Sequence, residues 1–136
     1  MFDATISLQR VFIVGDKSLF DEGLSNLLTF ETNLLISGSG YNDEITFLRD
    51  VAQAQPHVVI LNESAPLNPA RLLDLLISIP SLVGWRVIIV RPNNNTIDVY
   101  DFPYRSLLRK LHKRWQFNLT NRDDLIAVVK GAFRPN

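Results

Sequence analysis

Three polar residues stand where three apolar runs of the sequence stop: Asp16, Asn62 and Arg91. A carboxylate, an amide and a guanidinium that lie together could bind a small anion or metabolite, and the carboxylate could contribute to a metal site. None of the three is an activated nucleophile, and no nucleophile, general base and orienting group occur together along the chain. These residue types therefore favour binding and regulation over catalysis.

The element that positions Asn62 is the apolar stretch before it. Residues 58–61 read Val-Val-Ile-Leu, a continuous and mostly β-branched run that is typical of a strand covered on both faces of a parallel sheet. Ligands of open α/β sheets bind in the crevice beyond the carboxyl ends of the strands. We therefore expect Asn62 and Ser64 at such a crevice, together with Asp16 and Arg91, whereas strand alternation aims Glu63 away from Asn62.

Strands and helices are expected to alternate along the rest of the chain. Further strands are predicted at 10–14, 33–37, 86–90 and 115–119, and helices after Ser18 and at 43–54, 70–79, 104–114 and 123–133. The Gly-Ser-Gly segment at 38–40 lacks the lysine and further glycines of a phosphate-binding loop, so a strand-to-helix connection is the preferred interpretation. The alternation predicts one α/β domain over residues 1–136, with a parallel sheet and helices on both faces.

Composition narrows the classes of function. The 14 basic and 14 acidic residues cancel, so no net charge draws the chain to nucleic acid or to a membrane surface. The sequence has no cysteine, which excludes disulfides, thiolate metal sites and cysteine nucleophiles. The start of the chain lacks the pattern of a signal peptide, and no run approaches the roughly 18 apolar residues of a membrane span. We expect a cytoplasmic protein.

Four segments carry a resemblance: RVFIVGDKSLFDEGLSNLL, PHVVILNESAP, RVIIV and NRDDLIAVVKGAF. Together they resemble the receiver domain of bacterial two-component response regulators, particularly the NarL/LuxR type, over about residues 9–133. The resemblance implies a flavodoxin-like, three-layer α/β/α sandwich whose five-stranded parallel sheet has the order 2-1-3-4-5. A typical receiver accepts a phosphoryl group from a histidine kinase on an aspartate at the end of its third strand, with the help of Mg²⁺.

The residues at the matching positions depart from that pattern, so the resemblance implies a degenerate phosphorylation site. Gly15 and Asp16 stand where receivers have two acids, and Asn62 stands at the phosphoacceptor position. An amide cannot form the acyl phosphate that a carboxylate forms. Arg91 replaces the serine or threonine after the fourth strand, and Asn118 falls at the position of the lysine. We therefore expect no phosphorylation, no metal site and no cofactor.

Each of these residues also has a structural interpretation. Arg91 is expected to pair with Asp16 and to occupy the space of metal and phosphoryl group. Asp16 could equally be an acid that caps the first helix. Asn62 is expected to hydrogen-bond loop amides. Trp115 falls at the aromatic switch position of receivers, although a packing role is the more common one for tryptophan.

One basic cluster is a candidate interaction surface. Five cations gather in or next to the helix expected at 104–114: Arg105, Arg109, Lys110, Lys113 and Arg114. A solvated helix face is the default interpretation, and docking of a protein or nucleic acid is the alternative. His57 and His112 have no partner at metal-binding spacing.

The sequence leads to one main functional expectation and two alternatives. The main one is a phosphorylation-independent regulatory module, not an enzyme, that binds a protein partner or forms a homodimer. It would contact DNA only through an output domain of a LuxR-type regulator that is absent from these 136 residues. The dimer surface would be either the first and last helices or the fourth helix and fifth strand. The first alternative is a sensor of small anions at the crevice, and an enzyme on this fold is the weakest interpretation.

Overall fold

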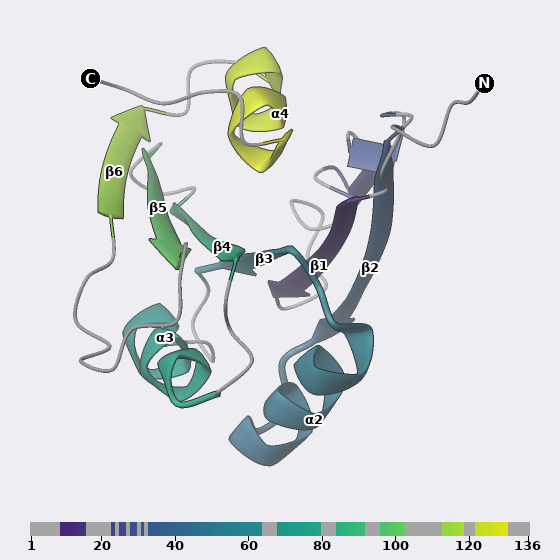
Figure 1. The fold of residues 1–136 in the computed structure, drawn as a ribbon, viewed down its shortest axis with the longest axis vertical. Coiled ribbons are helices and arrows are strands. Elements are labelled where there is room, and N and C mark those ends of the chain that lie inside the picture. The colour runs from purple at the N-terminus through teal and green to yellow at the C-terminus, as the bar shows by residue number, and fades with distance from the viewer. Residues whose placement is uncertain are drawn as a thin grey trace.

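The structure is a computed structural model, and it describes residues 9–15, 23, 25–26, 28–29, 31, 33–63, 68–79, 84–91, 96–102, 113–118 and 122–130. A six-stranded sheet in the order β2-β1-β3-β4-β5-β6 runs through these residues (Figure 1). Its strands are β1 (Gln9–Gly15), β2 (Leu34–Gly40), β3 (Val58–Asn62), β4 (Trp85–Arg91), β5 (Thr96–Phe102) and β6 (Lys113–Asn118). The helices are α2 (Glu44–Ala54), α3 (Pro69–Ile77) and α4 (Arg122–Lys130).

The α/β class and the strand order 2-1-3-4-5 are confirmed, but the expectation of an all-parallel, five-stranded sheet is wrong. Strands β1 to β4 are parallel, whereas β5 runs antiparallel to β4 and β6 antiparallel to β5. Only residues 92–95 separate β4 from β5. A parallel neighbour needs a crossover of a dozen or so residues, whereas a short link suits a hairpin.

Two further local expectations are corrected. The Gly-Ser-Gly segment is the end of β2 and not a connection, since Gly38, Ser39 and Gly40 pair with Ile13, Val14 and Gly15. Glycine at position 38 suits this pairing, because a Cβ there would lie 2.5 Å from the carbonyl oxygen of Ile13. The helix expected at 104–114 is wrong for residues 113 and 114, which lie in β6, and residues 103–112 lie outside the described residues.

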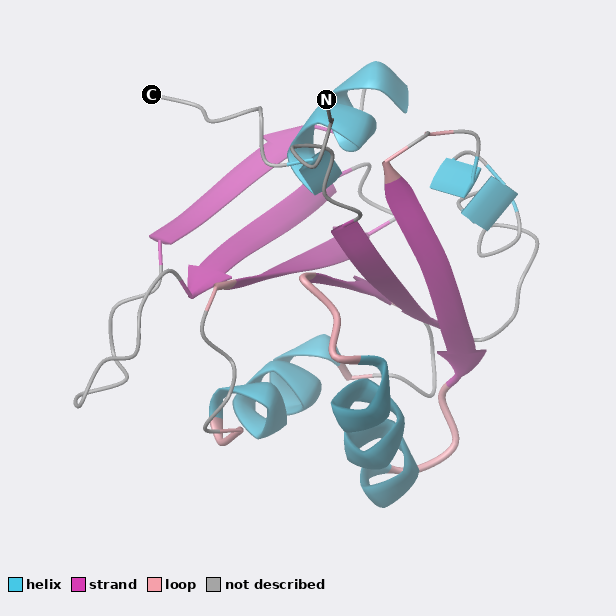
Figure 2. Ribbon diagram, turned by 45° about the vertical axis from the view of Figure 1, so that its right-hand side comes forward, coloured by secondary structure: helices cyan, strands magenta, loops and turns pink. Residues whose placement is uncertain are grey.

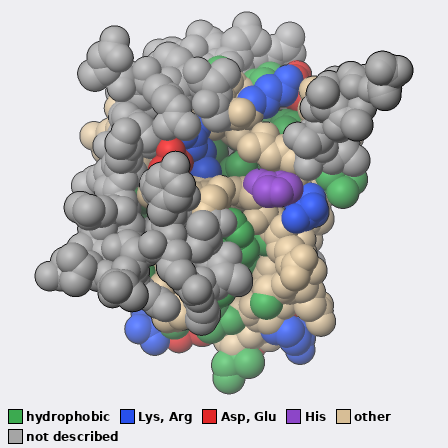
Figure 3. Space-filling model, in the orientation of Figure 1, with side chains coloured by type: hydrophobic (Ala, Val, Ile, Leu, Met, Phe, Trp, Pro, Cys, Tyr) green, Lys and Arg blue, Asp and Glu red, His purple; other side chains and the backbone are tan. Residues whose placement is uncertain are grey.

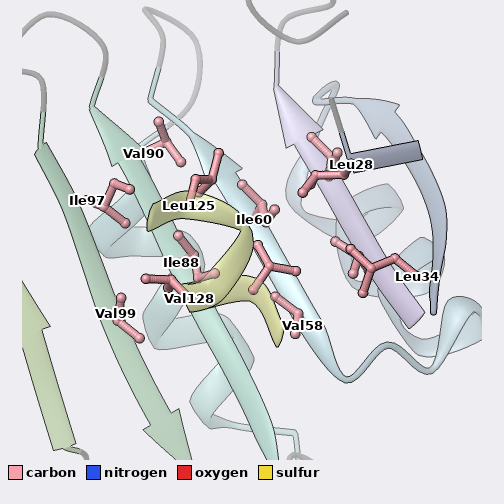
Figure 4. Close-up of a cluster of buried hydrophobic side chains, with 13 residues drawn as sticks. Leu28, Leu34, Val58, Ile60, Ile88, Val90, Ile97, Val99, Leu125 and Val128 are labelled. Carbon is pink, nitrogen blue, oxygen red and sulfur yellow. The ribbon is translucent and has the colours of Figure 1, made fainter. Parts of the chain in front are cut away.

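Helices lie on both sides of the sheet (Figure 2), and a cluster of buried apolar side chains lies on each face. Helices α2 and α3 cover one face, where Phe47 and Val51 of α2 and Leu72 and Leu76 of α3 pack on alternate residues of β1, β3 and β4. Helix α4 covers the other face through buried side chains that are shown over Ile60 and Ile88 in Figure 4. The side chains of α4 in this cluster are Leu125, Val128 and Val129. The continuous apolar runs at 58–61 in β3 and 87–90 in β4 follow from this coverage, because successive residues of each run pack towards one helix layer or the other.

Helix starts are specified by local side chains. The Asp43 carboxylate accepts a hydrogen bond from the N–H of Thr46 at the start of α2. Asn68 accepts from the N–H of Arg71 at the start of α3, where Pro69 is the first helical residue. Both are N-cap arrangements that satisfy backbone donors of the first turn. No helix among the described residues is long and apolar enough to span a membrane.

Candidate functional site

The ends of β1 and β3 carry the residues that the resemblance placed at the phosphorylation site. Gly15 ends β1, and Asn62 ends β3 with only 2% of its surface exposed. Asn62 pairs in register with Val90, whose side chain belongs to the α4 side of the core, so the Asn62 side chain points to that side. Asp16 and Ser64 lie outside the described residues.

Arg91 lies on the opposite face of the sheet from Asn62. Residues Val87 and Ile89 pack towards α2 and α3, and alternation along β4 places Arg91 on the same face. Its Nη1 lies 2.5 Å from Glu63 Oε2, and its Nε donates to Asp98 Oδ2 over 3.1 Å. The expected pairing of Arg91 with Asp16 is not tested, because Asp16 lies outside the described residues. The structure shows Arg91 in contact with two other carboxylates, those of Glu63 and Asp98.

These contacts extend into a row of polar residues that reaches from the residue after β3 to β6. Asp98 on β5 is only 1% exposed, and its Oδ1 accepts a hydrogen bond of 2.8 Å from Nε2 of Gln116 on β6. Glu63, directly after β3, is thus followed by Arg91 on β4, Asp98 on β5 and Gln116 on β6, and we call these four residues the polar row. A buried carboxylate is tolerated where a cation and hydrogen bonds compensate its lost hydration, which is what Arg91 and Gln116 supply.

The structure places two other predicted residues on a different strand from the one expected. The resemblance puts Asn118 and Trp115 on a strand beside β4, but β5 occupies that place and β6 lies one strand farther out. Asn118 pairs with Thr96 and Trp115 with Val99 in an antiparallel register, so the parallel arrangement expected for both is wrong. Of the basic cluster, Lys113 is the first residue of β6 and Arg114 is the second. The other three cations lie outside the described residues.

A second buried ion pair lies at the opposite end of the β4–β5 hairpin. Arg86 Nε and Nη2 donate to the two carboxylate oxygens of Asp101, over 2.6 and 2.7 Å. Arg86 Nη1 also donates to the carbonyl of Val128 in α4, over 2.7 Å. A cation beside a carbonyl near the end of a helix is favourable because backbone oxygens there lack helical partners. This bidentate contact links two strands and a helix.

His57 joins β1 to the start of β3. Its Nδ1 accepts a hydrogen bond of 2.9 Å from the backbone N–H of Arg10, and the backbone N–H of His57 donates to the carbonyl of Arg10. Burial first, and then the positive charge of Arg10, lower the pKa of His57 below the usual 6.5. Figure 3 shows the histidine side chain beside a basic side chain at the surface. The role of His57 is structural, because a neutral Nδ1 is required as acceptor.

Sequence reasoning missed Asp98, Gln116, Arg86 and Asp101. A signal for the first of these was present, because residues 96–102 alternate Ile97 and Val99 with polar residues, the pattern of a strand. A strand that follows Arg91 and runs back along β4 brings Asp98 close to that cation. The pairing of Gln116 had no comparable signal, since it depends on the direction of β6.

The described arrangement is a structural ion-pair network. The guanidinium of Arg91 joins Glu63 to Asp98 on β5, and Gln116 extends these contacts to β6, so the polar row helps to hold the strands together. Within the described residues, no three histidine, cysteine, aspartate or glutamate side chains form a group that could hold a metal ion. Comparison of the sequence with models of protein families and with curated proteins finds no match.

Proposed function

We propose that this chain is an atypical receiver-like domain, with flavodoxin-like layering, that regulates by protein association and does not accept a phosphoryl group. The observation that carries the proposal is Asn62, a buried amide at the end of the central strand. An amide at this place keeps the shape of a phosphoacceptor aspartate but lacks its nucleophilic oxygen. The order of the first four strands and the helices on both faces support the same proposal.

The pairing of charges in the polar row also supports the proposal. A phosphoryl group or another anion at the carboxyl ends of the strands would need a cation, and the candidate there is Arg91. Glu63 and Asp98 already surround its guanidinium. An incoming anion would have to displace two carboxylates, one of them nearly fully buried, so anion sensing is the less favoured function. The partner is a protein or a second copy, the setting is the cytoplasm, and DNA is reached only through a separate output domain.

Mass spectrometry after incubation with acetyl phosphate and Mg²⁺ tests the proposal. The wild-type chain is expected to keep its mass. The double variant Gly15→Asp, Asn62→Asp restores both acids and is expected to gain one phosphoryl group on residue 62. Asn68→Asp is the matched control, because it makes the same amide-to-acid change at an exposed helix cap that an aspartate also suits.

Two results would contradict the proposal. A phosphoryl adduct on the wild-type chain would refute phosphorylation independence. Failure of a folded double variant to take up the group, with circular dichroism like that of the wild type, would refute the receiver-like interpretation. A rise in melting temperature of the wild type with phosphate or nucleotides, but not with sodium chloride of equal ionic strength, would favour the anion sensor instead.

A further inference from the structure

In the part of the chain that the structure describes, one outer edge of the sheet lacks the charges and prolines that edge strands usually carry. Strand β2 ends the sheet, and among the described residues it pairs with β1 alone (Figure 1). Its sequence, Leu-Leu-Ile-Ser-Gly-Ser-Gly, contains no charge and no proline. The strand at the other edge, β6, includes Lys113 and Arg114. Charges and prolines are the common means by which edge strands avoid pairing with another chain, so β2 is the edge that is open to such pairing.

Two backbone hydrogen bonds at the ends of β2 determine which of its backbone groups face outward. The N–H of Gln9 donates to the carbonyl of Asn33, and the N–H of Tyr41 donates to the carbonyl of Gly15. Backbone groups of successive strand residues point to alternate sides. The odd-numbered residues from 33 to 41 therefore face β1, and the even-numbered residues of β2 turn their N–H and C=O groups away from it.

An exposed leucine lies on the same strand. The Leu35 side chain is 54% exposed, and it is one of two large apolar side chains with such exposure among the described residues. Leu34 and Ile36 pack towards the α4 side of the core, so Leu35 projects from the other face of the sheet, as does the exposed Ser37. A strand added at this edge would cover Leu35 along one side.

We propose that two copies of this chain associate by antiparallel pairing of their β2 strands about a two-fold axis near Ser37. An uncharged strand can meet a copy of itself without repulsion, and a two-fold axis makes the edge self-complementary. In this arrangement Leu35 of each copy lies across from the glycine and serine end of the other β2, and one sheet continues through both copies. This pairing would supply the surface for the regulatory association proposed above, and only its regulatory role rests on that proposed function.

Sedimentation velocity of the full chain over a range of concentrations tests the pairing. The wild type is expected to form a dimer that dissociates on dilution, because seven residues a side make a small interface. Ser37→Lys and Ser37→Asp are each expected to be monomeric, since like charges would face each other across the axis. An equimolar mixture of the two variants is expected to restore the dimer. Gln53→Lys and Gln53→Asp, at an exposed site on α2, serve as controls that keep the dimer.

Hydrogen exchange adds a position-specific readout. The amides of Ile36 and Gly38 face outward and are expected to gain protection as concentration rises, whereas those of Leu35 and Ser37 already face β1 and should not change. A monomeric wild type, a Ser37→Lys variant that dimerises normally or a mixture that stays monomeric would each overturn the inference. So would protection of the outward amides at every concentration, because the chain itself would then cover the edge. None of these results depends on phosphoryl uptake, which tests the proposed function separately.

Discussion

The buried guanidinium of Arg86 gives the sharpest prediction about stability. Arg86→Met keeps most of the side-chain volume but removes two hydrogen bonds to Asp101 and one to the carbonyl of Val128. The Asp101 carboxylate then loses that cation in a place where only 13% of its side chain is exposed. Removing one partner of a buried ion pair costs about 3–5 kcal/mol. Since a domain is stabilised by about 5–15 kcal/mol in total, this variant should lose a large share of its stability.

Urea denaturation followed by circular dichroism measures the loss. The double variant Arg86→Met, Asp101→Leu is expected to recover much of it, because both charges leave the low-dielectric site together. Arg71→Met is the matched control. Arg71 makes the same two-pronged contact with Glu44, at 2.9 and 3.1 Å, but on the exposed surface between α2 and α3. Its removal should shift the unfolding midpoint far less, since exposed ion pairs contribute little.

Two results would refute this reasoning. If Arg86→Met and Arg71→Met shift the unfolding midpoint equally, burial does not strengthen the Arg86 contact. If the double variant is no more stable than Arg86→Met alone, the loss comes from packing and not from the charge left on Asp101.

Three further predictions concern pH, charge and a helix cap. Burial and the charge of Arg10 lower the pKa of His57 in the folded state, so just below pH 6.5 the unfolded chain binds more protons than the folded one. The contribution of His57 to stability is therefore complete above pH 6.5 and is lost as the pH falls. His57→Gln should flatten this part of the profile of urea midpoint against pH. Arg91→Met removes the cation beside Asp98 and should cost about 1–3 kcal/mol in urea denaturation, with partial rescue by Arg91→Lys. Asn68→Ala removes the α3 cap and should cost about 1 kcal/mol in the same assay.

The sequence was sufficient for the elements whose signal is local. The apolar run at 58–61 predicted the buried strand β3, because a strand covered on both faces needs no polar side. The helical spacing at 43–54 predicted α2, whose buried residues Phe47 and Val51 follow that spacing. These signals depend only on neighbours within one element.

The hairpin and the polar row could not be derived in the same way. Residues 96–102 carry a strand pattern, but Pro103 and the cations after it suggested a loop and a helix. Without β5, no partner for Arg91 was visible except Asp16. Contacts between strands depend on direction and register, and neither is encoded in the period of a single segment. The sequence therefore placed Asn62 and Arg91 at the ends of two strands, as the structure does, but it did not predict the contacts of Arg91 with Glu63 and Asp98.

The direction of β5 also explains why Asp98 contacts Arg91. In a parallel sheet, the residue after the fourth strand would lie at the carboxyl edge of the sheet, and the chain would continue into a crossover connection. Here the chain returns at once, and Asp98 comes diagonally opposite Arg91 while Asp101 comes directly opposite Arg86. The two pairs lie on opposite faces of the hairpin, so a slip of one residue would turn each charge to the wrong side. Two Arg–Asp pairs thus specify the register of β4 on β5 from both faces. The guanidinium of Arg91 therefore contributes to the pairing of β4 with β5 through Asp98, while its other contact is with Glu63 directly after β3.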